Sequence, residues 1–195
     1  MRSRFLPEGR LLHTPENEAA CASCDGLRRA MEEGTVLEGV AQLCDGAHNL
    51  LVSVGPFTGF LPREEAALGI AEGTTREIAI LSRVGKPVCF QITALEESEG
   101  VLRPRLSRRR AQQAALDAML AGLHPGCILP AVVTHLESFG AFVDIGCGVP
   151  SLIGIENISV SRIPHPDQRF RVGQAIFAVV QELDPKLGRV YLTHR

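Results

Sequence analysis

Two phenylalanines that flank a Gly-Ala pair are the residues best suited to a specific chemistry in this sequence. They lie in the stretch SFGAFVDIG, residues 138–146, of a 195-residue chain that has eight Phe, one Tyr and no Trp. Side-chain alternation along a strand places the small aliphatic residues of this stretch on one face and Phe142 on the other. Gly140 can interrupt the alternation by a bulge or a twist, which would bring Phe139 to the face of Phe142.

Such a pair of rings has two possible uses. If both rings lie in the core, they contribute only to packing. If they are exposed, each ring can stack on a base of a single-stranded nucleic acid, and stacking needs no particular base sequence. Because the aliphatic residues already complete the inner face of the strand, the pattern favours exposed rings at Phe139 and Phe142.

Polar residues that could complete this surface lie at the end of the preceding strand and near the C-terminus. His135 ends the preceding predicted strand. Asp184 and Arg189 flank a predicted turn, where Arg189 can bind phosphate or stack on a base. Asp184 could orient Arg189 or accept a hydrogen bond from a base or ribose; alternatively, the two form an ordinary surface ion pair. Lys186 in the turn and Tyr191, which shares a strand face with Arg189, complete the predicted set.

A run of arginines, RPRLSRRR at residues 103–110, is a second feature that could contact phosphate. It holds no acidic residue and five arginines, namely Arg103, Arg105, Arg108, Arg109 and Arg110. The formal net charge of −2 argues against general binding of polyanions by the whole chain. The run is therefore either a solvated linker face or a local patch that attracts phosphate.

The six cysteines do not form a pattern that holds a metal. Cys21 and Cys24 make a single CxxC, and a zinc site would need a second pair of ligands at matching spacing. We therefore expect no metal and no cofactor. Scattered cysteines, the absence of a secretory signal and the lack of an apolar run of about 18 residues predict a cytoplasmic protein with no membrane contact.

Catalytic residues are not evident in the sequence. Glu64 and Glu65 are adjacent, but they lie at a predicted helix start, where acidic residues are favoured in any case. Asp144 and Asp184 lack the clustered acids of a two-metal nuclease, and no nucleotide-binding fingerprint is present. We expect a binding protein and not an enzyme.

The chain begins with an N-terminal extension, residues 1–33, that contains one predicted helix over residues 14–33. Thr14 can cap this helix, Pro15 suits its first position and Gly34 ends it. Short strand patterns follow, with a helical segment before the fourth, at residues 36–43, 50–55, 58–62, 86–96 and 100–107.

The same strand plan recurs after a helix predicted over residues 107–122. The second set of strand patterns covers residues 127–136, 140–146, 151–155, 174–184 and 189–194. Two copies of one strand order, about 90 residues apart, form an internal repeat. Five short strands with a long connection before the fourth are typical of the OB-fold barrel. The sequence therefore predicts a mainly β protein with helices, in which two tandem five-stranded barrels, 34–106 and 123–195, are joined by the α-helix.

Residues 123–195 resemble an S1-type RNA-binding domain. The resemblance is carried by FGAFV at 139–143, the strand and turn at 151–159, VGQ before the fourth strand, and the closing pattern DxxxGRxxL. It implies a five-stranded OB barrel that binds single-stranded RNA through the residues at four positions, Phe139, Phe142, Asp184 and Arg189. The family often has a His in the third strand, where this chain has Gly154. His135 or Tyr191 could make part of the RNA contact that the missing histidine makes in the family.

The first repeat resembles the same domain only weakly. VSVGPFTGFLPREEA, residues 52–66, is similar to the region of the second and third strands, but the position of the ring pair holds DGAHN. Phe57 and Phe60 lie later, and the core is one place for them. This repeat is expected to be a degenerate barrel for packing or protein docking.

The two-repeat layout as a whole resembles the ribosomal protein S1-like proteins of Gram-positive bacteria. The resemblance implies low-specificity binding of single-stranded RNA, above all mRNA, in translation, with the small ribosomal subunit as a possible partner of the first repeat. Two alternatives remain open. One is a protein-docking adaptor, and the other is an accessory RNA-binding module of a ribonuclease or RNA-processing assembly.

Overall fold

The computed structural model describes residues 5–195, so residues 1–4 of the predicted N-terminal extension lie outside the described residues. The chain divides into two compact units. One contains residues 8–113, and the other contains residues 114–195 together with the segment that ends at Pro7. The boundary between the units falls inside helix α4 (Arg108–Gly122), whereas the predicted domain limits lie at the two ends of that helix.

The N-terminal extension holds two helices, α1 (Pro15–Cys21) and α2 (Cys24–Glu33), so the prediction of a single helix is wrong. The break occurs at Ser23, whose backbone is extended (φ −144°) and whose side chain accepts a hydrogen bond from the Gly26 N–H. Ser23 thus caps α2 and starts a new helix. The predicted cap at Thr14 and the predicted end at Gly34, which has φ 64°, are confirmed.

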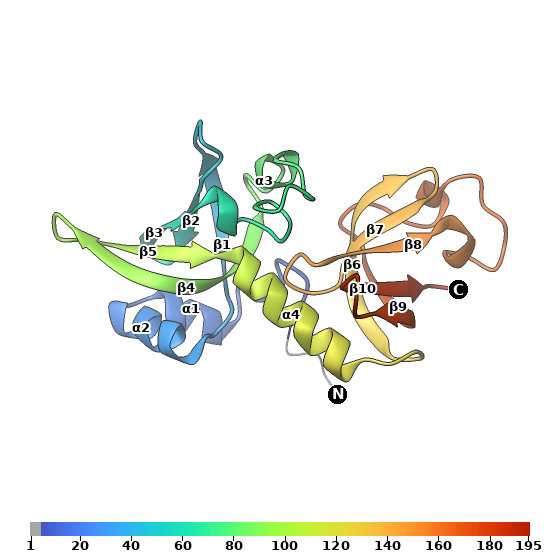
Figure 1. Ribbon diagram of the computed structural model, residues 1–195, viewed down its shortest axis with the longest axis horizontal. Helices are drawn as coiled ribbons and strands as arrows, with labels where there is room; N and C mark the ends of the chain where they lie inside the picture. The colour runs from blue at the N-terminus through green and yellow to red at the C-terminus, as the bar shows by residue number, and fades with distance from the viewer. Residues whose placement is uncertain (1–4) are drawn as a thin grey trace. The chain divides into compact units, whose positions relative to one another are not determined.

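The first barrel is a closed five-stranded barrel in which the strands follow the order β1-β2-β3-β5-β4 (Figure 1). Its strands are β1 (Leu37–Cys44), β2 (Leu50–Val54), β3 (Phe57–Leu61), β4 (Pro87–Ser98) and β5 (Val101–Ser107). A single parallel contact between β3 and β5 completes the barrel, while the other neighbours are antiparallel. Between β3 and β4 lie η1 (Arg63–Glu65) and α3 (Ile78–Leu81), where the sequence predicts a helical segment. Helices α1 and α2 pack against β1 and β4.

The strands of the second barrel form a five-stranded sheet in the order β10-β9-β6-β7-β8, in which the neighbours of the first barrel recur and β8 and β10 are the two edges. Its strands are β6 (Ile128–Glu137), β7 (Gly140–Asp144), β8 (Pro150–Gly154), β9 (Ala175–Asp184) and β10 (Arg189–Thr193). Two short turns of 3-10 helix, η2 (Ile155–Asn157) and η3 (Pro166–Gln168), lie in the long connection before the fourth strand. The edge strands β8 and β10 are joined where the Ser151 hydroxyl donates to the Val190 carbonyl at 2.5 Å.

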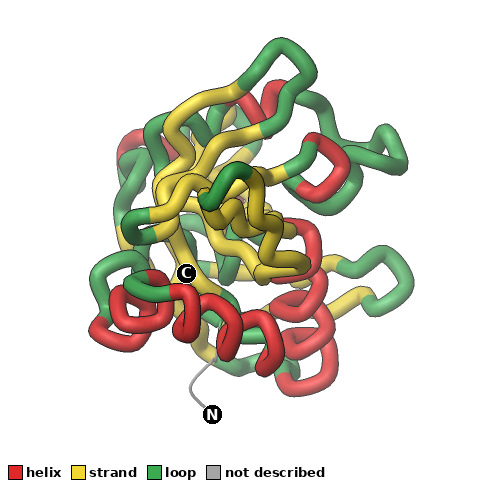
Figure 2. The backbone as a smooth tube through the Cα atoms, turned by 90° about the vertical axis from the view of Figure 1, so that its left-hand side faces the viewer, coloured by secondary structure: helices red, strands yellow, loops and turns green. Residues whose placement is uncertain are grey.

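The predicted fold class is confirmed, since the chain is mainly β and its helices are separate segments outside the sheets (Figure 2). The predicted start of α4 is also confirmed, because the Ser107 hydroxyl accepts a hydrogen bond from the Arg110 N–H at 3.0 Å. Among the helices of residues 5–195, none combines the length and the apolar character needed to cross a membrane.

Both barrels carry a bulge at the same place in the first strand. The register of β1 against β2 shifts just before Leu43, and the register of β6 against β7 shifts just before His135. After the shift, Leu43 lies opposite Leu51 and His135 lies opposite Phe142. The bulge and the pairing next to it therefore repeat, and Leu51 occupies in the first barrel the position of Phe142 in the second.

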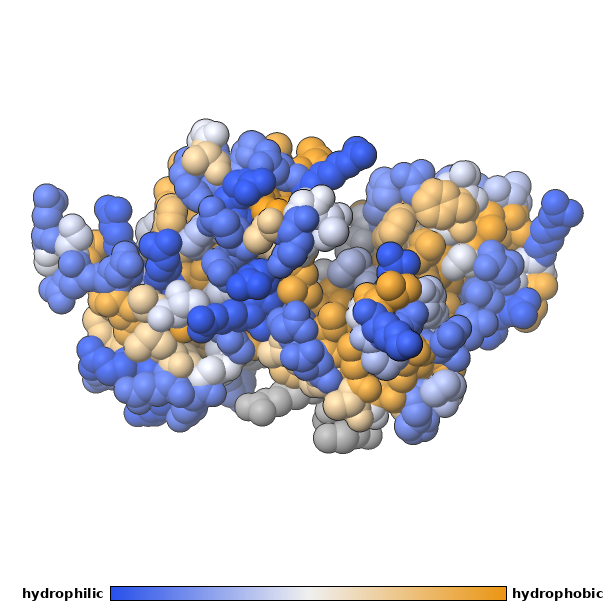
Figure 3. Space-filling model, in the orientation of Figure 1, coloured by the Kyte–Doolittle hydropathy of each residue, from blue (hydrophilic) through white to orange (hydrophobic). Residues whose placement is uncertain are grey.

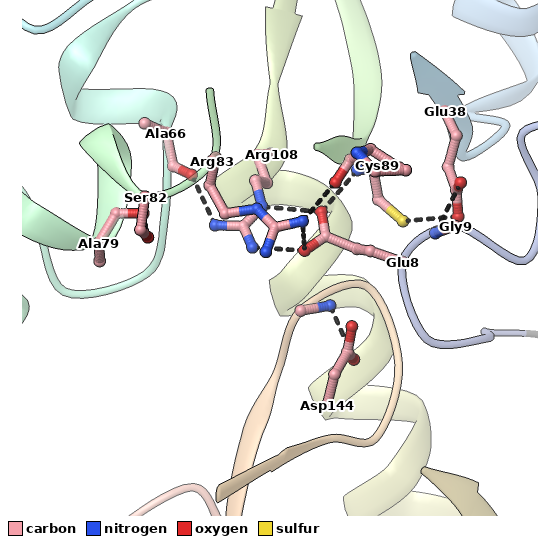
Figure 4. A network of polar contacts seen from close by, with 12 residues as sticks. Glu8, Gly9, Glu38, Ala66, Ala79, Ser82, Arg83, Cys89, Arg108 and Asp144 are labelled. Carbon is pink, nitrogen blue, oxygen red and sulfur yellow. Dashed lines mark hydrogen bonds and ion pairs between the residues drawn. The ribbon is translucent and has the colours of Figure 1, made fainter. Parts of the chain in front are cut away.

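A buried ion pair anchors the chain segment before α1 to the first barrel (Figure 4). Arg108 Nη2 lies 2.5 Å from Glu8 Oε1, and Arg108 Nε donates to Glu8 Oε2 at 2.9 Å. The Cys89 N–H also donates to Glu8, and Arg83 lies 3.6 Å away. Burial by itself raises the pKa of Glu8, but the guanidinium of Arg108, with that of Arg83, holds it below its ordinary value.

Candidate nucleic-acid interface

Phe139 and Phe142 form a ring pair on the outside of the second barrel, and we call these two side chains the ring platform. Their centroids are 6.1 Å apart, and the rings meet edge to face at 87°. Phe139 is 53% exposed, while Phe142 is half-buried. Ala141 and Val143 are fully buried on the opposite face of β7, as the alternation predicts. The structure therefore places both rings on the surface and not in the core.

Phe139 reaches this surface for a reason other than the predicted bulge at Gly140. β7 begins at Gly140, and its pairing with β8 shows no register shift. Phe139 belongs to the turn between β6 and β7, and its carbonyl accepts a hydrogen bond from the Ile155 N–H at 2.9 Å. Gly140 has a different task. A Cβ atom at that position would lie 2.4 Å from the Ile153 carbonyl oxygen, so glycine lets β7 pair closely with β8.

His135 extends the ring platform on the side of β6. The bulge in β6 places His135 opposite Phe142, and the two ring centroids are 6.1 Å apart with a tilt of 31°. His135 Nε2 lies 2.7 Å from Glu137 Oε1. Sequence reasoning missed Glu137, although its position two residues along the same strand from His135 is a usable signal. This carboxylate orients the imidazole beside the rings.

Asp184 orders the last hairpin and does not hold Arg189. Its Oδ1 accepts hydrogen bonds from the backbone N–H groups of Lys186 and Leu187, both at 3.1 Å. Arg189 is exposed and lies opposite Asp184 in the sheet, yet no ion pair joins their side chains in the part of the chain that the structure describes. The guanidinium of Arg189 and the ammonium of Lys186 therefore point into solvent, where they are available to phosphate.

Strand β8 separates the last strand, β10, from the strand that carries Phe142. Phe142 is paired with Leu152 of β8, and β8 is joined to β10 at Val190. Val190 points into the barrel, so its neighbours Arg189 and Tyr191 face outward. The predicted residues of β7 and β10 thus face outward, and β8 lies between these two strands.

Gly154 leaves part of this surface empty. It lies opposite Gly140 in the pairing of β7 with β8, so two glycines face each other beside the rings. The backbone of Gly154 has φ −60° and ψ 150°, which any residue can adopt. The atoms nearest to a Cβ atom there would be those of the Glu156 carboxylate, with Oε1 at 2.4 Å. The glycine is therefore a gap in the surface and not a requirement of the fold.

The arginine run does not form one basic patch, and the prediction that Arg108 contacts phosphate is wrong. Arg108 is buried and its guanidinium is bonded to Glu8 and to the Ala66 carbonyl. Arg109 is half-buried beside Glu65, with its Nε 3.4 Å from Oε2. The run is divided because strand β5 ends at Ser107 and helix α4 begins at the next residue, which turns successive side chains in different directions. Three arginines of the run are exposed, namely Arg103, Arg105 and Arg110.

Hydropathy alone does not single out the site. On the face drawn in Figure 3, hydrophilic side chains are interspersed with hydrophobic ones over both units. Within residues 5–195, no group of three or more His, Cys, Asp and Glu side chains lies close enough to hold a metal ion. The geometry of the rings is what identifies the surface.

The second barrel matches a known family, and a longer part of the chain is similar to known bacterial proteins. Residues 123–195 match the family described as S1 RNA binding domain. Over 183 residues the chain is 28% identical to small ribosomal subunit protein bS1 of Neisseria meningitidis, an alignment that covers 91% of this chain and 30% of that protein. Over 113 residues it is 37% identical to protein tex of Bordetella pertussis, which covers 58% of this chain and 14% of that protein.

A solved structure also matches part of the chain. The match with the solution structure of GSP13 from Bacillus subtilis covers 37% of this chain and 56% of the GSP13 chain, with 23% identity and a TM-score of 0.36. The chain thus spans 30% of the bS1 relative and 14% of the tex relative. The narrower resemblance to proteins of Gram-positive bacteria stays a prediction. Residues 123–195 match the family described as S1 RNA binding domain, and over most of its length the chain is similar to small ribosomal subunit protein bS1.

Proposed function

We propose that this chain binds single-stranded RNA with low sequence specificity through the outer surface of the second barrel. The observation that carries the proposal is the ring platform, in which Phe139 and Phe142 meet edge to face beside His135. Rings in this arrangement offer stacking surfaces to bases of any identity. Arg189 and Lys186, which are exposed at the adjoining hairpin, supply positive charge for the phosphates.

The biological setting is translation in the cytoplasm, with mRNA as the ligand. The bS1 relative is named as a protein of the small ribosomal subunit, and the alignment with it extends over both barrels. We propose that the small ribosomal subunit is a partner and that its contact lies on the first barrel. The chain acts as a binding protein and not as an enzyme, since its predicted functional residues are suited to stacking and to charge neutralisation.

The test is fluorescence anisotropy with a short labelled poly-U RNA and with its DNA counterpart, at two salt concentrations. Wild type is compared with the Phe139→Ala/Phe142→Ala double variant. Phe177→Ala is the matched control, because Phe177 is a 71% exposed ring of the same barrel that pairs with Pro130. Pro130 lies about 16 Å along β6 from His135, at about 3.3 Å per residue.

The proposal expects salt-sensitive RNA binding that the double variant loses and the control retains. Folding of each variant is checked by circular dichroism. RNA binding by the folded double variant at wild-type affinity would show that the rings are not the binding surface. Failure of folded wild type to bind RNA at either salt concentration would overturn the proposal and leave protein docking as the function of the barrel.

A further inference from the structure

A groove of about 660 Å³ lies on the first barrel, between strands β2, β3, β4 and β5. The residues that determine its chemistry are Phe57, Phe60, Glu96, Val101, Arg103 and Arg105. We call it the Arg–Phe groove. Its volume is within the range of about 300–1,000 Å³ typical of small-ligand sites. The sequence offers the core as one place for the two phenylalanines. Both are half-buried and border this groove, and Phe57 also packs against the core of the first barrel.

The groove already holds a guanidinium over an aromatic ring. Arg105 Cζ lies 5.6 Å from the centroid of Phe60, within the distance of a cation–π contact. Arg105 Nη1 also lies 3.7 Å from Glu96 Oε1, so the guanidinium is held from the side by a carboxylate. Arg103 is exposed at the same strand. Two arginines against one glutamate leave the groove positive, which favours an anionic occupant.

The last hairpin of the first barrel repeats the acid–arginine arrangement of the second barrel. Arg103 lies opposite Glu96 in the pairing of β4 with β5, as Arg189 lies opposite Asp184 in the pairing of β9 with β10. In both hairpins the pairing register shifts two residues after this arginine. In the first barrel the residue just before the shift is Arg105. The positions therefore correspond one to one.

The Phe142 ring also has a counterpart in the first barrel, on the neighbouring strand. In the second barrel the outward pair of strands two and three is Phe142 with Leu152, and in the first barrel it is Leu51 with Phe60. The aromatic side chain has moved from the second strand to the third, on the same outer face. A sequence comparison that looks for a Phe pair in the second strand does not find a ring that lies in the third strand. For that reason the sequence predicts that the first repeat is degenerate.

We propose that the Arg–Phe groove is a second binding site for single-stranded RNA, separate from the ring platform. A base stacks on Phe57 or Phe60, and the flanking phosphates lie against Arg103 and Arg105. The ligand class is that of the proposed function, but the site is carried by a different barrel and by its own contacts. Two sites on one chain raise the apparent affinity for a strand long enough to reach both.

Photocrosslinking tests this site on the full chain. Oligouridine RNA that contains 4-thiouridine is irradiated with the protein, and the adducts are mapped by mass spectrometry of the digested chain; an oligodeoxyuridine with 4-thio-deoxyuridine forms the DNA arm. Wild type is compared with the Phe139→Ala/Phe142→Ala variant, in which the ring platform is removed. The expected result is an adduct at or beside Phe57 or Phe60 in both proteins, at higher yield with RNA.

The outcomes separate this inference from the proposed function. Adducts in residues 123–195 alone would overturn the Arg–Phe groove and leave the ring platform supported. Adducts in the first barrel alone would support the groove and contradict the ring platform. Adducts in neither barrel, from a folded protein, would overturn both.

Affinity measurements in the platform-less variant give a second check. Adding Arg103→Gln and Arg105→Gln, which change exposed side chains, should lower the remaining RNA affinity at least fivefold and reduce its dependence on salt. Arg29→Gln, at an exposed position of α2, is the matched control and should leave both unchanged. Phe57→Leu with Phe60→Leu keeps apolar bulk but removes the rings, and should reduce the adduct yield. Unchanged affinity in the arginine variant would contradict the proposal.

Discussion

The ring of Phe139 meets the ring of Phe142 edge to face, with the centroids 6.1 Å apart and the planes at 87°. This arrangement presents two differently oriented aromatic surfaces at the outer edge of β7. One ring comes from a turn and the other from a strand, so the two differ in burial. Variants at the two positions should therefore differ in their effect on stability, although both affect binding.

Phe142→Ala should lower the affinity for poly-U about 5- to 150-fold, since each base stack contributes about 1–3 kcal/mol. It should also lower the melting temperature, because this ring is half-buried. Phe139→Ala should lower affinity by a similar factor with a smaller change in melting temperature, because that ring is 53% exposed. Anisotropy and thermal melts measure the two effects. Equal affinities for wild type and Phe142→Ala would contradict the ring platform.

Gly154→His should raise RNA affinity severalfold. The backbone at this position suits any residue, and the nearest group to an added Cβ atom is the exposed carboxylate of Glu156, which can move aside. The imidazole then fills the gap opposite Gly140, beside the rings. Gly154→Ala is the control, and it should gain about 0.4–1 kcal/mol of stability through the unfolded state without a gain in affinity. The idea of a gap fails if the two variants bind poly-U equally.

Gly140→Ala should destabilise the second barrel by about 1–3 kcal/mol, as overpacking does elsewhere. The added methyl group would lie 2.4 Å from the Ile153 carbonyl oxygen, and backbone cannot move aside as a side chain can. Gly122→Ala is the matched control, because nothing lies within 4 Å of a Cβ atom there. Urea unfolding gives both free energies. An unchanged free energy of unfolding for Gly140→Ala would mean that β7 and β8 can move apart without loss of stability.

Arg189→Gln should reduce the steepness of the salt dependence of RNA binding. Each phosphate contact to a single strand contributes about 0.7 to the slope of log K against log salt, so the slope should fall by about that amount. Arg110→Gln tests whether the exposed arginine at the start of α4 takes part. Titrations at several salt concentrations measure the slopes. An unchanged slope for Arg189→Gln would remove this residue from the binding surface.

Glu8→Gln should destabilise the protein by about 3–5 kcal/mol near pH 7, because it removes the carboxylate charge that faces the buried guanidinium of Arg108. The pKa of Glu8 is lowered in the folded state, so its contribution is present above the ordinary Glu pKa of about 4.3. The contribution is lost as the pH falls through the lowered value. The difference between wild type and variant should therefore shrink below about pH 4.

Denaturant unfolding at several pH values measures this difference. Glu32→Gln, at an exposed position of α2, is the control and should be close to neutral at every pH. A difference that stays constant from neutral to acidic pH would show that the loss comes from packing and not from the ion pair.

The sequence by itself determined the strands, the repeat and the outward direction of Phe142, whereas the turn that holds Phe139 beside it appears only in the structure. Strand alternation, turn residues and caps are local properties, and local spacing is what a sequence displays directly. For this reason the burial of Ala141 and Val143 and the outward direction of Phe142 follow from the order of the residues in β7. The placement of His135 depends in addition on the bulge in β6, which the sequence does not mark.

The tertiary structure decided which charges are free and which rings border a groove. Arg108 and Glu8 are separated by 100 positions, so no local pattern distinguishes Arg108 from its exposed neighbour Arg110. Phe60 and Arg105 meet only because β3 and β5 pair when the first barrel closes. Such contacts form between segments that are distant in the sequence. Which charges are buried and which rings stay exposed therefore depends on how those segments pack.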